Sequence, residues 1–424
     1  MRIWIVNNYA IPPCFGGLVR HFYFSKYLRA MGHDVRILTG SQVHNTTYNF
    51  VQPGELLNEV TFDGVPYTYV RTMGYTKNNW RRIVNMLQFS FRCKKAMQKL
   101  LAEGERPDVI YASSPVPFSS KSAMSFAKRH HIPFLFEVRD LWPQSLVEYG
   151  NLNEKPYTKP VVAALYALEH ALYRGANRIV FTMAGGTTYL HDRGWTDIPE
   201  EKCVQINNGV DLQEFHHNAQ QVRYEDPDLD DPSTFKVVYM GSIRMTYGLD
   251  VMLDVAKRCL EELPNVRFLF YGGGTELTHL NERIKRENIT NASFKGKVKK
   301  EEIPSILMRA DVTLAHNRAT AITRYGSSNN KLFEYLAAGA PILSTVKTEG
   351  SLVVTQDIGI ETEDQNVETI VKALIALTRL TPKERDEIRN REQSLVREYD
   401  YSYLSSQMEK IFQSMIDEAT HNEY

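Results

Sequence analysis

The chain has 424 residues, of which 43% are hydrophobic and 24% are charged, the balance of an ordinary globular protein. At roughly 100–200 residues per domain, this length accommodates two or three domains with separate cores. Fifty Lys and Arg residues balance fifty Asp and Glu residues, so the formal net charge is zero. This neutrality argues against a dedicated nucleic-acid-binding protein, because such proteins are usually basic.

The four cysteines lie far apart and form no Cys-x-x-Cys pair. This spacing is typical of a reducing compartment and does not indicate a zinc site. No stretch approaches the roughly 18 apolar residues of a membrane-spanning helix, and the N-terminal apolar run is too short for a secretory signal. We therefore expect a cytoplasmic protein, with room for peripheral contact at the inner face of the plasma membrane.

The first forty residues predict a strand, a glycine-bearing loop, a helix and a second strand. Residues 2–7 (RIWIVN) and 34–39 (DVRILT) are short apolar runs with β-branched residues, and residues 18–32 carry apolar side chains at helical spacing. This order is typical of a βαβ unit. Further strands are expected at 108–112, 133–138, 178–182 and 203–207, with helices between them, so residues 1–215 predict a doubly wound, Rossmann-like domain.

Residues 216–234 have almost no apolar content and contain prolines at 227 and 232, which predicts a surface linker. A second βα series follows over residues 235–395 and predicts a second Rossmann-like domain. Its strands are expected at about 235–240, 267–271, 292–294, 312–315 and 341–344. The fold class is therefore α/β, with two Rossmann-like domains whose sheets face a central cleft, and a long helical stretch ends the chain.

Glycines and an arginine mark two loops that can contact phosphate. Gly16 and Gly17 stand directly before a helix, where the backbone can approach an anion, although a tight βα turn explains the pair equally well. Arg244 follows the strand at 235–240 and can fork onto a diphosphate, although an exposed surface arginine is the simpler explanation. Gly272–Gly274 do not complete a dinucleotide fingerprint, so we expect a backbone-lined pocket edge there.

The segment 324–341 is the most informative of the chain. Its polar residues 327–330 lead straight into a helix, whose first amides and Lys331 can hold a phosphate. Glu334 can accept two ribose hydroxyls, or it can serve only as a carboxylate that suits the helix dipole.

Three charged residues, Glu137, Arg139 and Asp140, end the strand at 133–138. We expect them to point toward the cleft rather than the core, where Asp140 can hydrogen-bond a sugar or act as a base. Pairing among the three is the alternative. Asp226-x-Asp228 resembles a metal-binding Asp-x-Asp motif, but it lies in the predicted linker rather than at a strand end, so no metal is expected.

Residues 71–106 carry nine Lys and Arg residues and two Glu residues, a local net charge of +7. Aromatic and aliphatic side chains, among them Trp80, Leu87 and Phe91, alternate with these cations. Such a stretch attracts anionic headgroups while its aromatic rings enter the interface. A core-packing helix with a solvated basic face is the alternative, and nucleic acid would need a broader basic surface.

Taken in order, these motifs resemble the retaining GT-B glycosyltransferases of family four. The matching segments are the first-strand Gly-Gly loop, GHDVRILTG, NNGVD followed by Phe215, GSIR with GLD, FYGGG, NASFKGKVKKEEIPSILMRADVTLA and NNKLFEYLAAGAPI. They cover nearly the whole chain, and NNGVD and KLFEYLAAGAPI are the specific ones. FEVRDLWP and SSNNKLFEY are similar to a bacterial branch that adds N-acetylated or deoxy aminosugars in surface-polysaccharide (O-antigen or capsule) assembly.

The resemblance implies transfer of a sugar, with retention, from a nucleotide-diphosphate donor, expected to be UDP-linked, to a glycan or lipid-linked acceptor. The donor would bind to the second domain, with Glu334 on the ribose. The diphosphate would contact Gly16, Gly17, Arg244, Ser328, Asn329, Asn330, Lys331 and Leu332. The base would contact Gly273, Lys297 and Val298. Glu137, Arg139 and Asp140 would lie near the transferred sugar, no metal or other cofactor would be needed, and residues 396–424 would form a helix returning to the first domain.

The sequence departs from the family pattern at three positions. Gly326 stands where the family often has the first Glu of a Glu-x7-Glu pair that ends at Glu334. Arg139-Asp140 takes the place of a His-Asp pair, and Tyr247 occupies the neighbourhood of an expected diphosphate-binding lysine. A sugar-nucleotide epimerase of the same fold and a non-catalytic sugar- or nucleotide-binding module are the alternatives, and turnover with an acceptor distinguishes them.

Overall fold

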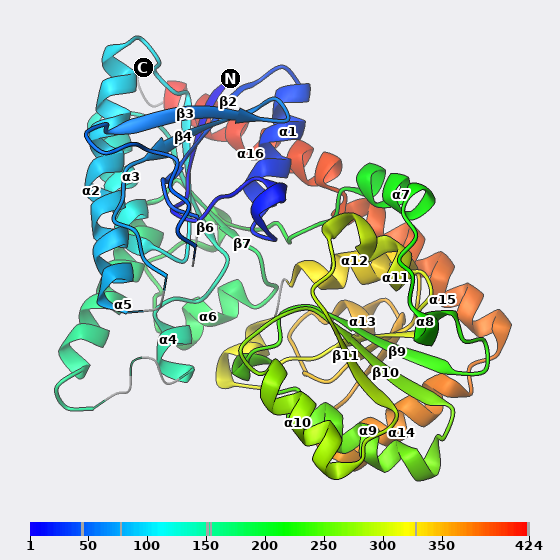
Figure 1. Cartoon of the computed structure of the whole chain (residues 1–424). Coiled ribbons are helices and arrows are strands. Elements are labelled where there is room, and N and C mark those ends of the chain that lie inside the picture. The colour runs from blue at the N-terminus through cyan, green and yellow to red at the C-terminus, as the bar shows by residue number, and fades with distance from the viewer. Residues whose placement is uncertain (44–45, 77–78, 150–151, 153–154, 327–328, 422–424) are drawn as a thin grey trace. The chain divides into compact units, whose positions relative to one another are not determined.

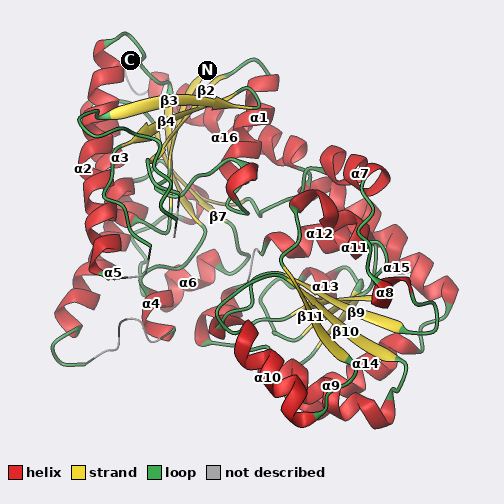
Figure 2. Cartoon of the chain, in the orientation of Figure 1, coloured by secondary structure: helices red, strands yellow, loops and turns green. Residues whose placement is uncertain are grey.

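The computed structural model describes residues 1–43, 46–76, 79–149, 152, 155–326 and 329–421 (Figure 1). The chain forms two compact units. Unit 1 comprises Met1–Asn207 together with Tyr401–Tyr424, and unit 2 comprises Asn208–Asp400. Helices cover both faces of the sheet in each unit (Figure 2). No helix in the described ranges is both long and apolar enough to cross a membrane.

Unit 1 contains an eight-stranded sheet in the order β3-β4-β2-β1-β5-β6-β7-β8. Its strands are β1 (Arg2–Val6), β2 (Asp34–Gly40), β3 (Leu57–Phe62), β4 (Val65–Val70), β5 (Val109–Ser113), β6 (Phe134–Val138), β7 (Arg178–Phe181) and β8 (Cys203–Gln205). All neighbouring strands pair in parallel except β3 and β4, which are antiparallel. The central strands β5 and β6 are buried at every residue, as expected for parallel strands covered on both faces.

The helices of unit 1 connect these strands. They are α1 (Arg20–Ala30), α2 (Trp80–Ala102), α3 (Pro117–Arg129), α4 (Gln144–Glu148), α5 (Lys159–Gly175), α6 (Gly186–Asp192) and α16 (Tyr401–His421). The hairpin formed by β3 and β4 escaped sequence analysis. Asp63 and Gly64 form its two-residue turn with positive φ angles of 47° and 78°, so the Asp-Gly pair was the available signal.

Unit 2 contains a six-stranded, wholly parallel sheet in the order β11-β10-β9-β12-β13-β14. Its strands are β9 (Phe235–Met240), β10 (Val266–Tyr271), β11 (Ala292–Gly296), β12 (Val312–Ala315), β13 (Ile342–Ser344) and β14 (Gly359–Glu361). Its helices are α7 (Leu212–Gln221), α8 (Pro227–Asp230), α9 (Asp250–Glu262), α10 (Leu277–Glu287), α11 (Ile303–Leu307), α12 (Asn330–Ala338), α13 (Leu352–Thr355), α14 (Val367–Thr378) and α15 (Pro382–Leu395).

The segment 216–234 is not a surface linker but part of unit 2. The boundary between the units follows Asn207 rather than residue 215, and α7 and α8 occupy most of the segment. Asp226 is buried, accepts a hydrogen bond from the Tyr271 hydroxyl (2.7 Å) and pairs with Lys295 Nζ (2.8 Å). The polar composition suggested a linker. The residues that pair with Asp226 (Tyr271 and Lys295) lie on strands far along the chain and could not be identified from the segment itself.

Helix α16 completes the core of unit 1, although it follows unit 2 in the chain. The residues that it buries recur every three or four positions: Tyr401, Leu404, Met408, Phe412 and Met415. The ring of Tyr401 stacks on that of Tyr23 in α1, with centroids 4.8 Å apart. The predicted boundary at residue 395 therefore moves to Asp400, and one expected helical stretch becomes two helices, α15 and α16.

We expect Phe412→Ala to lower the free energy of unfolding of unit 1 by about 3–5 kcal/mol, because the side chain is fully buried in the core cluster and leaves a cavity. Denaturant unfolding followed by tryptophan fluorescence measures this unit alone, since residues 4, 80, 142 and 195, all in unit 1, are the four tryptophans. Gln413→Ala, at an exposed neighbouring position, should stay within about 0.5 kcal/mol of wild type. Equal effects of the two changes would contradict the docking of α16.

Candidate functional site

Each sheet has one point where the strand order reverses. In unit 1 it lies between β1 and β5, and in unit 2 between β9 and β12. Loops leave the carboxyl ends of two such strands in opposite directions, which opens a crevice where ligands of α/β proteins bind. The candidate residues follow these strands or their neighbours.

Close backbone packing explains the glycines after β10. A Cβ atom at Gly272 would lie 1.7 Å from the carbonyl oxygen of Gly241, and one at Gly274 would lie 1.8 Å from that of Ile243. The amide of Ile243 also donates to the Gly273 carbonyl (3.0 Å). The loops after β9 and β10 therefore pack against each other through bare backbone, so a backbone-lined edge is present beside the β9 loop.

Two of the three residues predicted to contact the base are neighbours. A Cβ atom at Gly273 would lie 2.5 Å from Lys297 Cε, so the aliphatic stem of Lys297 covers this glycine. Val298 is partly buried and packs against the core cluster below α12. Gly273 and Lys297 therefore lie together, whereas Val298 packs into the core of unit 2.

Two arginines lie on adjoining loops of unit 2. Arg244 is exposed and begins the loop after β9, while Arg318 is exposed in the loop after β12. The amide of Arg318 donates to the Thr246 carbonyl (3.2 Å), which joins the two loops. Within the described ranges neither arginine forms an ion pair. Sequence analysis missed Arg318, and its position just beyond the strand at 312–315 was the available signal.

Lys331 supplies a buried cation at the start of α12. Its side chain is 9% exposed, and Nζ lies 4.2 Å from the ring centroid of Tyr239 and 4.6 Å from that of Tyr247. Nζ donates to the His316 carbonyl (3.4 Å), and burial lowers the pKa of Lys331 to about 7. The ammonium therefore lies against Tyr247, the residue that stands where the family resemblance expects a lysine.

A buried histidine connects the loops around Lys331. His316 Nε2 donates to the Gly248 carbonyl (3.1 Å), and Nδ1 then accepts from the Thr345 hydroxyl (2.5 Å), which assigns the tautomer. Burial, assisted by the charge of Lys331, holds the pKa of His316 down to about 4, so the imidazole is neutral near pH 7. His316 positions the β9 loop against β12 and β13, and sequence analysis did not identify it.

Glu334 lies three positions after Lys331 on α12, which places both side chains on one helix face. It is partly buried, and burial raises its pKa to about 7, with Lys300 opposing and Glu214 reinforcing the shift.

The next residue, Tyr335, anchors the helix. Its hydroxyl accepts from the Met240 amide (2.9 Å) and donates to the Leu314 carbonyl (3.2 Å). This contact fixes α12 to the ends of β9 and β12.

The first turn of α12 is well placed for an anion. Asn329 is the N-cap residue, and its side chain accepts no capping hydrogen bond from the helix. The amide of Asn330 belongs to this turn, the amide of Leu332 donates to the Asn329 carbonyl (3.1 Å), and predicted Ser328 lies outside the described residues. Gly326 has a φ of +99°, a left-handed conformation that a glutamate would adopt only with strain, which explains the departure from Glu-x7-Glu.

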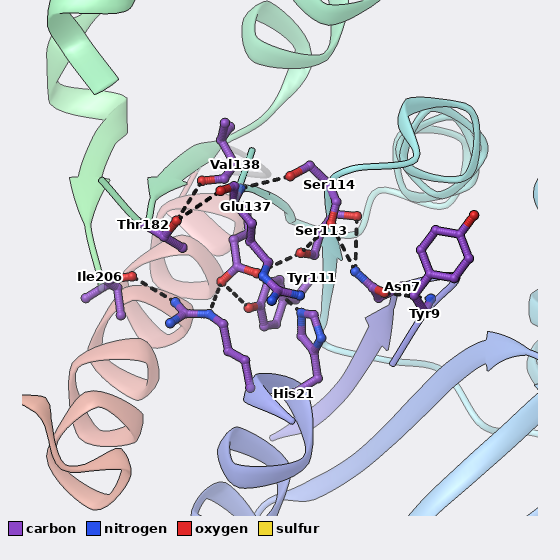
Figure 3. Close-up of polar contacts among 12 residues, drawn as sticks. Asn7, Tyr9, His21, Tyr111, Ser113, Ser114, Glu137, Val138, Thr182 and Ile206 are labelled. Carbon is purple, nitrogen blue, oxygen red and sulfur yellow. Dashed lines mark hydrogen bonds and ion pairs between the residues drawn. The ribbon is translucent and has the colours of Figure 1, made fainter. Parts of the chain in front are cut away.

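In unit 1, Glu137 does not point toward solvent and is a core residue. Its side chain is fully buried (Figure 3). Oε1 accepts from Arg20 Nε (2.7 Å) and the Tyr111 hydroxyl (2.5 Å), and Oε2 accepts from the Ser113 hydroxyl (2.7 Å). The prediction that Glu137 points toward the cleft rather than the core is therefore wrong, because a buried arginine from α1, distant in sequence, neutralises it.

The rest of the cluster explains how Glu137 stays charged. The Arg20 guanidinium also donates to the carbonyls of Ile206 (2.8 Å) and Asn207 (2.5 Å). Burial opposes ionisation of Glu137, but the charge of Arg20 and contacts with His21 outweigh it and hold its pKa well below the ordinary range. Burial lowers the pKa of His21, so this ring is a neutral neighbour (Figure 3).

Arg139 and Asp140 remain at the edge of unit 1. The Ser114 hydroxyl accepts hydrogen bonds from their amides, at 2.8 Å and 3.2 Å. The Arg139 side chain is partly buried, and Asp140 is exposed, so Asp140 is the solvent-facing carboxylate of the predicted trio. Gly16 and Gly17 also belong to unit 1, so they are not part of the unit 2 group formed by Arg244, Lys331 and Glu334.

No group of three or more His, Cys, Asp or Glu side chains in the described part of the chain is placed to hold a metal ion. The Asp226-x-Asp228 motif is occupied by Lys295, whose Nζ contacts Asp226 Oδ1 (2.8 Å) and Asp228 Oδ2 (2.5 Å). With Lys295 between them, these two carboxylates are already paired with a cation of unit 2.

We expect Glu137→Gln to lower the free energy of unfolding of unit 1 by about 3–5 kcal/mol at pH 7, because it leaves the buried Arg20 charge unpaired. The native pKa of Glu137 lies below its unfolded value, so this stabilisation is present above about pH 4.5 and is lost as the pH falls further. The gap between variant and wild type, followed by tryptophan fluorescence, should therefore narrow in acid. The exposed control Asp140→Asn should change stability by less than about 0.5 kcal/mol; an equal loss in both variants would refute the buried-pair assignment.

Solved structures resemble the whole chain at low sequence identity. Sucrose-phosphate synthase from Thermosynechococcus elongatus has a TM-score of 0.71 at 15% identity, covering 98% of this chain and 99% of that one. HepE from Anabaena, in complex with UDP and glucose, has a TM-score of 0.66 at 14% identity, covering 98% and 100%. The E. coli trehalose-6-phosphate structure bound with UDP-2-fluoro glucose has a TM-score of 0.71 at 11% identity, covering 97% and 99%. These similarities confirm the fold.

Two protein-family models match the sequence in series. The model of the Glycosyl transferase 4-like domain matches residues 16–209, and that of Glycosyl transferases group 1 matches residues 234–379. No curated protein sequence is significantly similar to the chain. The two matches together span most of the chain and fall on its two parallel-sheet units. The chain therefore carries two glycosyltransferase family domains in series, a Glycosyl transferase 4-like domain and a Glycosyl transferases group 1 domain, on a GT-B fold.

Proposed function

We propose that the protein transfers a sugar from a UDP-linked donor to a glycan or lipid-linked acceptor, with retention of configuration, and that unit 2 binds the donor. The observation that carries this proposal is the placement of Lys331. A buried ammonium without a carboxylate partner in the described ranges lies at a helix start, beside two arginine-bearing loops and three residues from Glu334. Two of the similar solved structures contain UDP or a UDP-sugar, which supports this choice of donor.

The unit 2 cations would stabilise the leaving diphosphate. Cleavage of the donor leaves negative charge on the diphosphate, and fixed positive groups lower the energy of that transition state. Lys331 would contact the phosphates together with the Asn330 amide, and Arg244 would supply a planar fork. Together they would provide the charge that a metal ion supplies in other sugar transferases, so we propose transfer without a metal or other cofactor.

Tyr247 makes the role of Lys331 more specific. Burial beside the Tyr239 and Tyr247 rings has a cost for the ammonium, which is visible in its lowered pKa. A bound diphosphate would repay that desolvation and return the lysine to its charged form. The family resemblance expects a diphosphate-binding lysine near residue 247, in the loop after β9. We propose that Lys331, which lies on α12, takes its place.

On the ribose, Glu334 would accept two hydroxyl hydrogen bonds. In unit 1, Asp140 and Arg139 would interact with the transferred sugar or acceptor, while Glu137 holds the local structure. An aminosugar donor and an acceptor in surface-polysaccharide assembly are the finer proposals. They rest on the resemblance of FEVRDLWP and SSNNKLFEY to that bacterial branch. Release of UDP that depends on an added acceptor separates a transferase from an epimerase or a binding module.

Glu334→Ala should weaken UDP binding by about 30- to 1,000-fold, because two charged hydrogen bonds are lost, and Glu334→Gln should weaken it less. Because the native pKa of Glu334 is about 7, affinity for UDP-glucose should fall as the pH drops below 7, where binding must displace a proton. The glutamine variant should lose this acid limb. Calorimetric titration measures both effects, with the exposed Glu301→Ala as control. Unchanged affinity in a folded Glu334→Ala protein would reduce the residue to a helix-start carboxylate.

Lys331→Met should keep the volume of the buried stem and remove the charge. We expect at least about a 10-fold loss in UDP-glucose affinity, and a larger loss in kcat/KM, because the charge on the diphosphate grows in the transition state. Wild-type affinity should also decline above about pH 7, as the lysine loses its proton, and the variant should lack this alkaline limb.

Wild-type turnover should be retained when the kcat/KM assay is run in excess chelator. A requirement for added metal would overturn the assignment of charge to Lys331 and Arg244.

A further inference from the structure

Helix α2 exposes an apolar ridge to solvent. Its members are Trp80, Ile83, Leu87 and Phe91, whose exposed fractions are 61%, 57%, 48% and 64%. Their spacings of three, four and four positions place them on one helix face, opposite the buried face that contains Phe89, Cys93 and Met97. At about 1.5 Å per residue the ridge runs for roughly 16 Å along α2, a helix at one flank of unit 1 (Figure 1). An outer helix face is normally polar, so this ridge requires an explanation.

Cations accompany the ridge along its length. The Arg81 guanidinium lies 5.8 Å from the Trp80 ring centroid, and Lys95 Nζ lies 4.8 Å from that of Phe91. Lys94 is the next cation on the same side of the helix. In the part of the chain that the structure describes, none of these three cations forms an ion pair with a carboxylate. The ridge is therefore bordered by positive charge that the protein itself does not neutralise.

A pocket of about 590 Å³ opens beside the ridge. Leu87 and Phe91 line it together with the segment Gly54–Leu56 and the cations Arg71, Arg92 and Lys95. Its one acidic residue, Glu55, is exposed and makes no ion pair with these cations within the described ranges. The pocket thus combines three positive groups and one negative group with an apolar wall.

Arg92 is held in place in this pocket. Its Nη1 donates to the Arg71 carbonyl (2.9 Å) and to Gln88 Oε1 (3.4 Å). Both arginines line the pocket, and burial, together with the charge of Arg71, lowers the pKa of Arg92. Such a pair favours an anion that can bind both guanidinium groups, and a phosphate group has the charge and the acceptor oxygens to do so.

We propose that the ridge and the pocket form one docking surface for a membrane of anionic phospholipids. The pocket would bind a lipid phosphate through Arg71 and Arg92, while Trp80, Ile83, Leu87 and Phe91 enter the interfacial layer. A soluble phosphate ligand would account for the arginines but not for the ridge, and an acidic protein partner would not need exposed aromatic side chains bordered by lysines. Amphipathic surfaces of this composition bind at the headgroup boundary. This inference is independent of the proposed donor site, which lies in unit 2.

The test is co-sedimentation of the full chain with phosphatidylcholine vesicles, with and without phosphatidylglycerol. We expect binding to the anionic vesicles at low salt that weakens as salt is added, and little binding to the neutral ones. Lipids brominated near the headgroup boundary should quench the fluorescence of wild type more than that of Trp80→Phe. No binding to anionic vesicles at low salt, or equal binding to neutral vesicles, would overturn the proposal.

Two pairs of variants separate the parts of the surface. Arg71→Gln with Arg92→Gln should reduce the partition coefficient on anionic vesicles by about 25-fold, at roughly fivefold per cation. Leu87→Ser with Phe91→Ser should reduce it by at least about 10-fold and abolish quenching, because the ridge no longer enters the interface. Lys257→Gln with Arg258→Gln, on exposed positions of α9, removes the same charge elsewhere and should change binding less than threefold.

Further readouts keep the result interpretable. Unfolding followed by tryptophan fluorescence checks that each variant is folded, and calorimetric titration with UDP checks that unit 2 is unaffected. If glycerol phosphate in solution binds to wild type and not to the arginine variant, while vesicle binding is the same in both, the pocket serves a soluble anion and the membrane proposal fails. If the α9 control loses as much vesicle binding as the arginine variant, the attraction is non-specific and the assigned surface is wrong.

Discussion

The buried ion pair between Arg20 and Glu137 organises the carboxyl edge of the unit 1 sheet. The guanidinium joins α1 to β6 through the carboxylate, and it reaches the carbonyls of Ile206 and Asn207, where the chain leaves unit 1. Two charges removed from water are stabilising only when their remaining hydrogen-bonding groups are satisfied. Here Tyr111 and Ser113 from β5 complete the shell of the carboxylate. This cluster anchors the strand end that Arg139 and Asp140 follow.

The corresponding edge of unit 2 is organised on the opposite principle. Its buried cation, Lys331, lies against two tyrosine rings and a carbonyl oxygen, and burial lowers its pKa to about 7. Neutral groups do the positioning: His316 joins the loops after β9 and β12, and Tyr335 fixes α12 to both strands. In unit 1 the buried Arg20 is paired with Glu137, whereas the buried Lys331 of unit 2 has no carboxylate partner within the described ranges. That contrast supports the proposal that unit 2 binds an anionic donor.

The surface of α2 follows the same reasoning about incomplete pairing. A helix that buries Phe89, Cys93 and Met97 on one face has no folding requirement for apolar residues on the other. Arg71 and Arg92 line one pocket, and in the part of the chain that the structure describes neither forms an ion pair with a carboxylate. Exposed apolar side chains and cations without a carboxylate partner raise the free energy of the isolated chain in water, and the proposed membrane surface, anionic outside and apolar beneath, would relieve both.

The sequence alone determined the features that depend on local pattern. Apolar runs located β1, β5, β9 and β12, and the polar segment before Lys331 located the start of α12, because strand and helix periodicity and capping are set by neighbouring residues. The Asp-Gly turn between β3 and β4 carried the same kind of signal, although it was overlooked. The sequence also predicted that Lys331 and Glu334 lie on one helix face, because residues three positions apart in a helix are neighbours.

Only the tertiary structure decided which charges meet. Glu137 looked like a cleft residue until α1 brought Arg20 to it across 117 positions of sequence, and Asp226 looked like part of a linker until β10 and β11 supplied Tyr271 and Lys295. His316 and Arg318 acquired roles only because β12 pairs with β9, which places their loop beside that of Arg244. Strand order and the docking of distant helices select the partner of a charged group, and these long-range pairings leave no periodic trace in the sequence.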